Sequence, residues 1–262
     1  MARRRNSNRR RRRGSFGFLY KLLSTLVICG AIIVALTLFF RVDNIVVTGQ
    51  QRYTAAEVAE ATGVEIGDNL YLLNKNRVAN NILEKLPYIE NIHPYRRLPD
   101  TLVIEITECG TPLAVVQDGS AWLISPSGDP GGKIVDQKDA SAAADYGIID
   151  GCQLLAPTVG TPMALATEYA NQQTSLLALM KALHEEGMIE QVDAIHLDDL
   201  SVLSMDYAGR FTVQLPYGAD YAQKLKALRQ ILEESGAIQD NMTGTFDMRR
   251  DDGQIPFKQN VR

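Results

Sequence analysis

The segment from residue 89 to residue 108, IENIHPYRRLPDTLVIEITE, decides the fold of the first half of the chain. Its last eight residues alternate in polarity, which predicts a half-buried β-strand. Three aliphatic residues face inward: Leu102, Ile104 and Ile106. Val103 is expected on the outward face with its polar neighbours. Residues 89–97 predict a second strand, and Pro94 restricts that strand to a sheet edge or a bulge.

The residues before this hairpin predict two short helices and one more strand. Thr54 and Glu57 form a capping-box pattern at the start of the first helix. The second helix is expected to begin near Asn74, to carry an apolar stripe and to end at Pro87. Residues 42–49, VDNIVVTG, read as a half-buried strand. The order strand, helix, helix, strand, strand predicts two helices packed on one face of a three-stranded sheet.

A basic head and an uncharged run precede this unit. Residues 22–40 contain no charged side chain and would span about 28 Å as a helix, close to the thickness of a bilayer core. Basic residues remain on the cytoplasmic side, so the rest of the chain is expected outside. The residues expected to set this topology are Arg9, Arg10, Arg11, Arg12, Arg13 and Lys21.

Two alternatives exist for this N-terminal region. A cleaved signal peptide is disfavoured because the apolar run is long and no small-x-small cleavage site follows it. Nucleic-acid binding by the arginines is disfavoured by their position beside the apolar run. Removing the nine cations of residues 1–21 leaves 18 basic and 31 acidic residues, a net charge of −13. An exported part this acidic is a poor ligand for nucleic acid.

The second half of the chain predicts a mixed sheet with two helices. A hairpin is expected around Asp118-Gly119, with Trp122 in a core, and residues 128–141 are expected to form a polar loop. Helices are expected over residues 167–186 and after Asp220. Further strands are expected near residues 146–149, 194–197, 203–207, 211–215 and 243–249, the last of these ending the fold. Cys109 and Cys152 are expected outside the membrane, where pairing is possible but spacing alone does not establish it.

Several short motifs, in this order after a span, resemble those of the FtsQ/DivIB family of bacterial cell-division proteins. They are Val42-x-x-Ile45-x-Val47-x-Gly49, Gly67-x-Asn69-Leu70, Leu86-Pro87-Tyr88-Ile89 and Arg97-Leu98-Pro99-Asp100-Thr101-Leu102-x-Ile104-x-Ile106-x-Glu108. The resemblance implies an α+β protein in which a single transmembrane helix precedes a POTRA domain (β-α-α-β-β) and a mixed-sheet β domain. The implied divisions are a basic head at 1–21, a span at 22–40, a POTRA domain at 41–109, a β domain at 110–250 and a tail at 251–262.

The resemblance also implies partners and a binding surface. Family members bind FtsL and FtsB/DivIC, two kinds of single-span division protein, and connect through them to the septal peptidoglycan synthase. No cofactor is implied. The family's binding surface corresponds here to residues 245–257, where an edge strand would accept a partner strand. The candidate contacts are Thr245, Asp247, Arg249, Arg250, Gln254, Ile255 and Phe257. Some members have an aromatic residue at the place of Arg250, so the chemistry of that contact differs here.

Motifs for catalysis and metal binding are missing from the sequence. No HExxH, CxxC, GxSxG or phosphate-binding glycine loop occurs, which disfavours an enzyme and a zinc site. His196 with Asp198 or Asp199 is the one local pairing of histidine with acid. Two alternatives to a scaffold remain: a cell-wall-modifying enzyme that uses this pair, and a POTRA-containing chaperone. The chaperone alternative is disfavoured because neither repeated POTRA units nor a long series of barrel strands is present.

Overall fold

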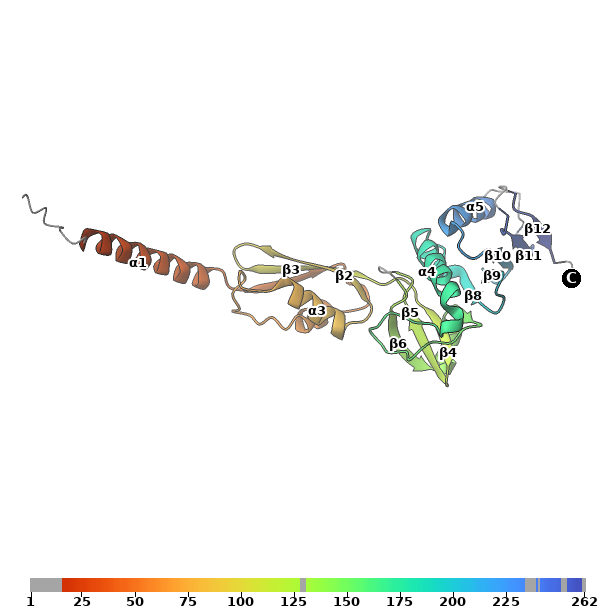
Figure 1. Ribbon diagram of the computed structural model, residues 1–262, viewed down its shortest axis with the longest axis horizontal. Helices are drawn as coiled ribbons and strands as arrows, with labels where there is room; N and C mark the ends of the chain where they lie inside the picture. The colour runs from red at the N-terminus through yellow and green to blue at the C-terminus, as the bar shows by residue number, and fades with distance from the viewer. Residues whose placement is uncertain (1–15, 128–130, 234–238, 240, 251–253, 261–262) are drawn as a thin grey trace, which may run out of the picture.

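The structure is a computed structural model that describes residues 16–127, 131–233, 239, 241–250 and 254–260. Helix α1 (Phe16–Phe39), a three-stranded sheet and a nine-stranded sheet follow one another along the molecule (Figure 1). Within α1, Gly17–Thr37 is long and apolar enough to cross a membrane, and none of it is buried against protein. Lys21 lies exposed in α1, whereas Arg9, Arg10, Arg11, Arg12 and Arg13 fall outside the described residues.

The first sheet has the strand order β1-β3-β2. Strand β1 (Asn44–Thr48) runs parallel to β3 (Thr101–Glu108), and β2 (Ile89–Arg97) runs antiparallel to it. The β2 strand lies at the edge, and its register shifts between Ile89 and Asn91. The expectation drawn from Pro94 is therefore confirmed, because a residue without an N–H group is tolerated on an edge strand.

Helices α2 (Ala55–Ala61) and α3 (Lys75–Lys85) begin at the expected caps. Glu57 N–H donates to Thr54 Oγ1 at 3.2 Å, and Thr54 N–H donates to Glu57 Oε2 at 2.7 Å. Asn74 Oδ1 accepts from the first free N–H groups of α3. Both helices bury apolar side chains in one core with the sheet: Val47, Val58, Val78, Ile82, Leu102, Ile104 and Ile106.

Val103 lies on the face away from the helices, as expected, yet it is completely buried and not exposed like its polar neighbours. Val103 occupies the middle strand, and its register partners are Val46 on β1 and Tyr95 on β2. Partners in register share a face of the sheet. The two neighbours therefore shield Val103 from water.

The second sheet has the order β12-β11-β10-β9-β8-β7-β4-β5-β6. Its strands are β4 (Leu113–Gln117), β5 (Ser120–Ile124), β6 (Ile134–Asp139), β7 (Ile148–Asp150), β8 (Val192–His196), β9 (Leu203–Tyr207), β10 (Phe211–Leu215), β11 (Gly244–Asp247) and β12 (Phe257–Gln259). Helices α4 (Ala170–Glu185) and α5 (Tyr221–Glu233) share its main core, and short 3-10 helices occupy Ala140–Asp145, Thr167–Tyr169 and Ile189–Gln191.

Three expectations for this region are wrong. The described residues of the expected 128–141 loop include strand β6, which pairs antiparallel with β5. Trp122 is only partly buried, because β5 directs it to the margin of the main core. The strand predicted at 243–249 does not end the fold, since β12 follows it and pairs with β11. Part of the expected 251–262 tail therefore belongs to the sheet.

A small contact joins the two sheets. Tyr88, directly before β2, donates from its Oη to Asp136 Oδ2 of β6 at 3.0 Å, while its carbonyl accepts from Cys109 N–H at 2.8 Å within the first unit. Tyr88 also packs among Ala114, Leu123 and Val135 of the second sheet unit. Cys109 packs at this junction, whereas Cys152 packs against the main core, and both are free thiols.

Candidate partner-binding edge of the second sheet

The outermost strand at one end of the second sheet is β12, and β11 lies inside it between β10 and β12. Strand β11 runs parallel to β10 and antiparallel to β12. Helix α5 lies between β10 and β11 in the chain and packs on the same core (Figure 1). The edge expected within residues 245–257 is therefore formed by β12 and not by β11.

The main chain of β12 alternates between its partner strand and the open side. Asp247 N–H donates to the carbonyl of Pro256 at 3.0 Å, and Asn260 N–H donates to the carbonyl of Thr243 at 2.9 Å. In an antiparallel ladder the residues between such bonded positions point their N–H and C=O groups the other way. Phe257 and Gln259 consequently direct theirs to the open side of the sheet.

Phe257 attaches β12 to the core. Its ring centroid lies 4.7 Å from that of Phe246 and 6.3 Å from that of Phe211. Gly244 is required beneath the ring, because a Cβ there would lie 2.7 Å from Phe257 Cζ. Phe246 and Met248 are buried, as expected for core residues of the neighbouring strand. Phe257 is thus an anchor of the strand within this protein as well as a residue of its edge.

Arg249 and Asp247 form a bidentate ion pair where β11 ends. Arg249 Nε and Nη2 lie 2.8 and 2.6 Å from the two carboxylate oxygens of Asp247. These hydrogen bonds lower the pKa of Asp247 from 3.8 to about 2. Arg249 is exposed on its other faces, so the pair presents a fixed guanidinium plane to solvent.

A shallow hollow of about 240 Å³ lies between α5 and the segment that leads to β12. Three of the predicted contact residues line it: Arg250, Gln254 and Ile255. Lys224 of α5 holds the segment in place, because its Nζ donates to the carbonyls of Met248 at 2.9 Å and Arg250 at 3.2 Å. Ile255 is partly buried against the main core.

The structure therefore divides the seven predicted contact residues between two neighbouring places. Arg250, Gln254 and Ile255 lie in the hollow, whereas the others lie on the two outermost strands or at the end of β11. Sequence reasoning missed the bonds of Lys224 to this segment and the position of Gln259 on the edge strand. The i, i+4 spacing of α5 could have placed Lys224 near the sheet, but no local pattern marks the three-residue strand β12.

The histidine considered as a catalytic base makes different contacts from those expected. His196 Nδ1 lies 2.7 Å from Asp150 Oδ1 and Nε2 lies 3.1 Å from Asp206 Oδ2, so Asp198 and Asp199 are not its hydrogen-bond partners. Burial alone would lower the pKa of His196, but the bonds to Asp206 and Asp150 raise it above 6.5. Asp198 lies within 4.8 Å of the His196 and Asp150 ligand atoms, yet both ring nitrogens already have carboxylate partners.

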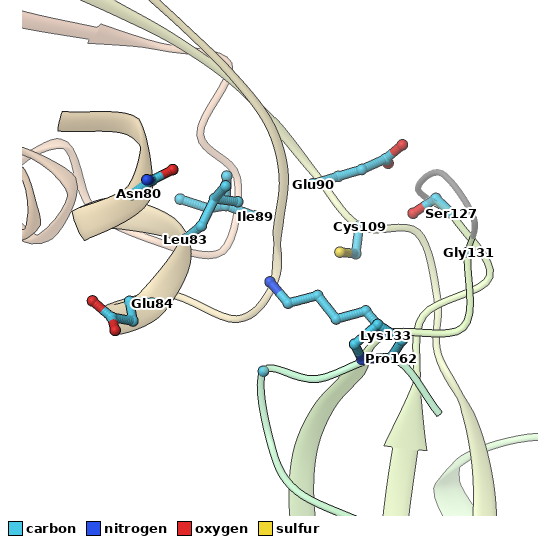
Figure 2. A pocket seen from close by; sticks show the side chains of 11 residues that line it. Asn80, Leu83, Glu84, Ile89, Glu90, Cys109, Ser127, Gly131, Lys133 and Pro162 are labelled. Carbon is cyan, nitrogen blue, oxygen red and sulfur yellow. The ribbon is translucent and has the colours of Figure 1, made fainter. Parts of the chain in front are cut away.

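A larger cleft, of about 620 Å³, lies between the two sheets. Figure 2 shows Lys133 extending into it from the second sheet unit, opposite Leu83 and Glu84 of α3. Cys109 also lines the cleft, and burial raises the pKa of its thiol. None of the residues predicted for partner binding lines this cleft.

Comparison with known proteins agrees with this architecture. Residues 40–108 match the POTRA domain of FtsQ type. Cell division protein FtsQ of Geotalea daltonii is 27% identical over 206 residues, which cover 77% of this chain and 70% of that protein. Cell division protein FtsQ of Syntrophotalea carbinolica is 24% identical over 235 residues, covering 84% and 77% respectively.

A relative with the second family name matches a shorter stretch. Cell division protein DivIB of Streptococcus gordonii is 34% identical over 97 residues, which cover 34% of this chain and 24% of that protein. The two FtsQ relatives match most of the chain, whereas the match to the POTRA domain is confined to residues 40–108. The chain therefore contains a POTRA domain of FtsQ type, and over most of its length it is similar to cell-division proteins of the FtsQ/DivIB family.

Proposed function

We propose that this cell-division protein is a non-catalytic membrane scaffold, which binds FtsL-like and FtsB/DivIC-like single-span proteins and so organises septal peptidoglycan synthesis. The observation that carries this proposal is the open edge of β12. Phe257 and Gln259 offer main-chain donors and acceptors there, and the hollow beside α5 offers Arg250, Gln254 and Ile255.

Strand addition suits this surface for two reasons. Main-chain hydrogen bonds along β12 would supply affinity that does not depend on partner sequence, and the adjacent hollow would select a side chain. Arg249, fixed by Asp247, is placed to meet a carboxylate of the partner at the same end of the strand. The POTRA domain is a second candidate surface for recruitment.

The proposed topology follows from α1 and the arginine-rich head. The head remains in the cytoplasm, α1 crosses the plasma membrane once, and both sheets lie outside it. This arrangement presents β12 on the side of the membrane where the septal wall is made. It also gives all three proteins of the complex the same surroundings, since each partner crosses the membrane once.

A pair of substitutions at one position tests the edge of β12. The full chain is co-expressed with its FtsL- and DivIC-like partners, and the partners retained on the purified protein are measured. Gln259→Pro removes the outward N–H but no bond to β11, and proline is tolerated on edge strands. Gln259→Ala keeps the N–H and removes the side chain.

We expect roughly a tenfold loss of partner retention for Gln259→Pro, equivalent to about 1.4 kcal/mol, and little change for Gln259→Ala. Hydrogen exchange at the Asn260 amide, which bonds to Thr243, checks that β12 remains in the sheet. Equal retention by the two variants, with Asn260 protected in both, would show that partners do not pair with β12.

A further inference from the structure

The membrane-facing end of the POTRA domain is attached directly to the end of α1. Asn69 Nδ2 donates to the carbonyl of Thr37 at 3.1 Å, and Leu70 N–H donates to the carbonyl of Phe40 at 2.9 Å. The rings of Phe40 and Tyr71 meet edge to face with centroids 4.8 Å apart. These contacts fix the position of the 69–72 loop relative to the apolar helix.

The loop extends back along the helix. Ile33, Leu36 and Thr37 of α1 share a hollow of about 360 Å³ with Asn69, Tyr71 and Leu72. Thr37 ends the stretch that is apolar enough to cross a membrane, and Ile33 lies about 6 Å further in along the helix axis. Leu72 is therefore beside the last turn of the membrane-crossing stretch, at the depth of the outer interface of the bilayer.

The turn between β2 and β3 lies at the same end of the domain. Asp43 N–H, four residues after Phe39, donates to the carbonyl of Asp100 at 2.8 Å. Leu98 in this turn is 53% exposed, while Leu72 is 78% and Tyr71 is 50% exposed. We define Tyr71, Leu72 and Leu98 as the membrane-proximal rim.

Arg96 fixes the conformation of the 69–72 loop through its hydrogen bonds to the main chain. Its guanidinium donates to the carbonyls of Leu70 at 2.6 Å, Tyr71 at 3.1 Å and Leu73 at 2.8 Å. A loop held by three hydrogen bonds from one side chain keeps its apolar residues exposed instead of folding them inward. The exposure of Leu72 is thus built into the domain.

We propose that the membrane-proximal rim lies in the outer leaflet of the bilayer, so that the POTRA domain rests on the lipid surface and not only on its tether. Lipid is favoured because the rim is continuous with α1 and reaches the depth of its apolar residues. Tyr71 is the kind of side chain that concentrates at the membrane interface. The proposal depends on α1 as a span and is independent of the edge of β12.

Apolar contact rather than charge should dominate this attachment. Exposed side chains of both charges lie near the rim, among them Arg41, Arg97, Asp43 and Asp68. Such a balanced set gives little net attraction to anionic headgroups, and salt would screen what remains. The attachment is therefore expected in neutral and anionic lipid alike.

Tryptophan emission in bilayers tests the proposal. The full chain is placed, one copy to a disc, in lipid discs whose acyl chains carry bromine, which quenches nearby indoles. The parent chain has a single tryptophan, Trp122, which supplies the background. Leu72→Trp and Leu98→Trp add a probe to the rim, and Leu200→Trp is the matched control because Leu200 is 74% exposed on the second sheet unit.

We expect brominated lipid to remove roughly half of the added emission at residues 72 and 98 and little at residue 200, because interfacial rings lie within reach of acyl chains. Added salt or anionic lipid should not change this ratio. Quenching at both rim positions no greater than at residue 200 would overturn the proposal. If the emission of the tryptophans at residues 72 and 98 shifts to shorter wavelength but brominated lipid does not quench it, the rim is covered by protein and not by lipid. That result would also overturn the proposal.

Discussion

Replacing Phe257 by alanine tests how strand β12 is held in the sheet. The ring contacts Phe246 at a centroid distance of 4.7 Å and lies above Gly244. Removing a fully buried phenylalanine side chain costs about 3–5 kcal/mol. Phe257 is only partly buried, so we expect roughly half of this, or about 2 kcal/mol, as a loss of local stability.

Hydrogen exchange measures this loss where β12 meets β11. The amides of Asp247 and Asn260 are protected by the carbonyls of Pro256 and Thr243. A loss of about 2 kcal/mol should speed their exchange roughly 30-fold, because each 1.4 kcal/mol is a factor of ten. Partner binding should fall in the same variant, since a detached strand no longer presents an ordered edge.

Lys258→Ala provides the control, because that side chain is exposed and lies on the opposite face of the same strand. In Lys258→Ala, the amides of Asp247 and Asn260 should exchange at the parental rate. Parental exchange at both amides in Phe257→Ala would refute the anchoring role of the ring. Undiminished partner binding by a chain in which both amides had lost protection would refute the role of β12 as the binding edge.

Three further perturbations have outcomes that follow from single contacts. Thr54→Ala removes the cap of α2 and should lower the free energy of unfolding by about 1 kcal/mol in urea titrations. Arg249→Ala should return the pKa of Asp247 from about 2 towards 3.8 in an NMR titration. The ion pair stabilises the folded parent above pH 3.8, and this stabilisation is lost as the pH falls towards 2, so the variant should lack it. The raised pKa of His196 stabilises the folded state below pH 6.5, so stability should fall as pH rises above this value in the parent but not in His196→Gln.

The first sheet could be predicted from sequence because its signals are local. The capping box at Thr54, the glycine-free alternation of residues 101–108 and the restriction imposed by Pro94 each act within a few residues. Val103 was the exception. Its burial depends on which strand lies in the middle of the sheet, and alternation within one strand carries no information about its neighbours.

The second sheet was less predictable at both of its edges. Strand β6, IVDQKD, is polar after its first two residues because it is the last strand on its side. Strand β12 has only three residues, and aromatic contacts of Phe257 hold it in the sheet. The contacted rings are Phe246, 11 residues earlier in the chain, and Phe211, 46 residues earlier. The periodicity of a sequence cannot indicate contacts between residues so far apart. The resemblance therefore located the region of the candidate site, and the structure identified its edge strand.

The hollow beside α5 shows the same limit. Arg250, Gln254 and Ile255 were named from their place in the family's binding segment, not from any pattern of their own. They share one surface because Lys224 of α5 donates hydrogen bonds to the backbone of this segment. Lys224 lies 26 residues before Arg250 in the chain. Neither hydrophobic spacing nor charge pattern indicates a bond from a lysine to two main-chain carbonyls.

The position of β12 determines how far from α1 a partner must extend in order to pair with this strand. Figure 1 shows β12 at the end of the molecule opposite α1. From β6 to β12 the sheet spans eight strand spacings, about 38 Å at ~4.8 Å each. A single-span partner that rises as a helix would need about 25 residues to cover that distance alone. A membrane-anchored partner that pairs with β12 must also extend past the POTRA domain, which lies between α1 and the second sheet (Figure 1).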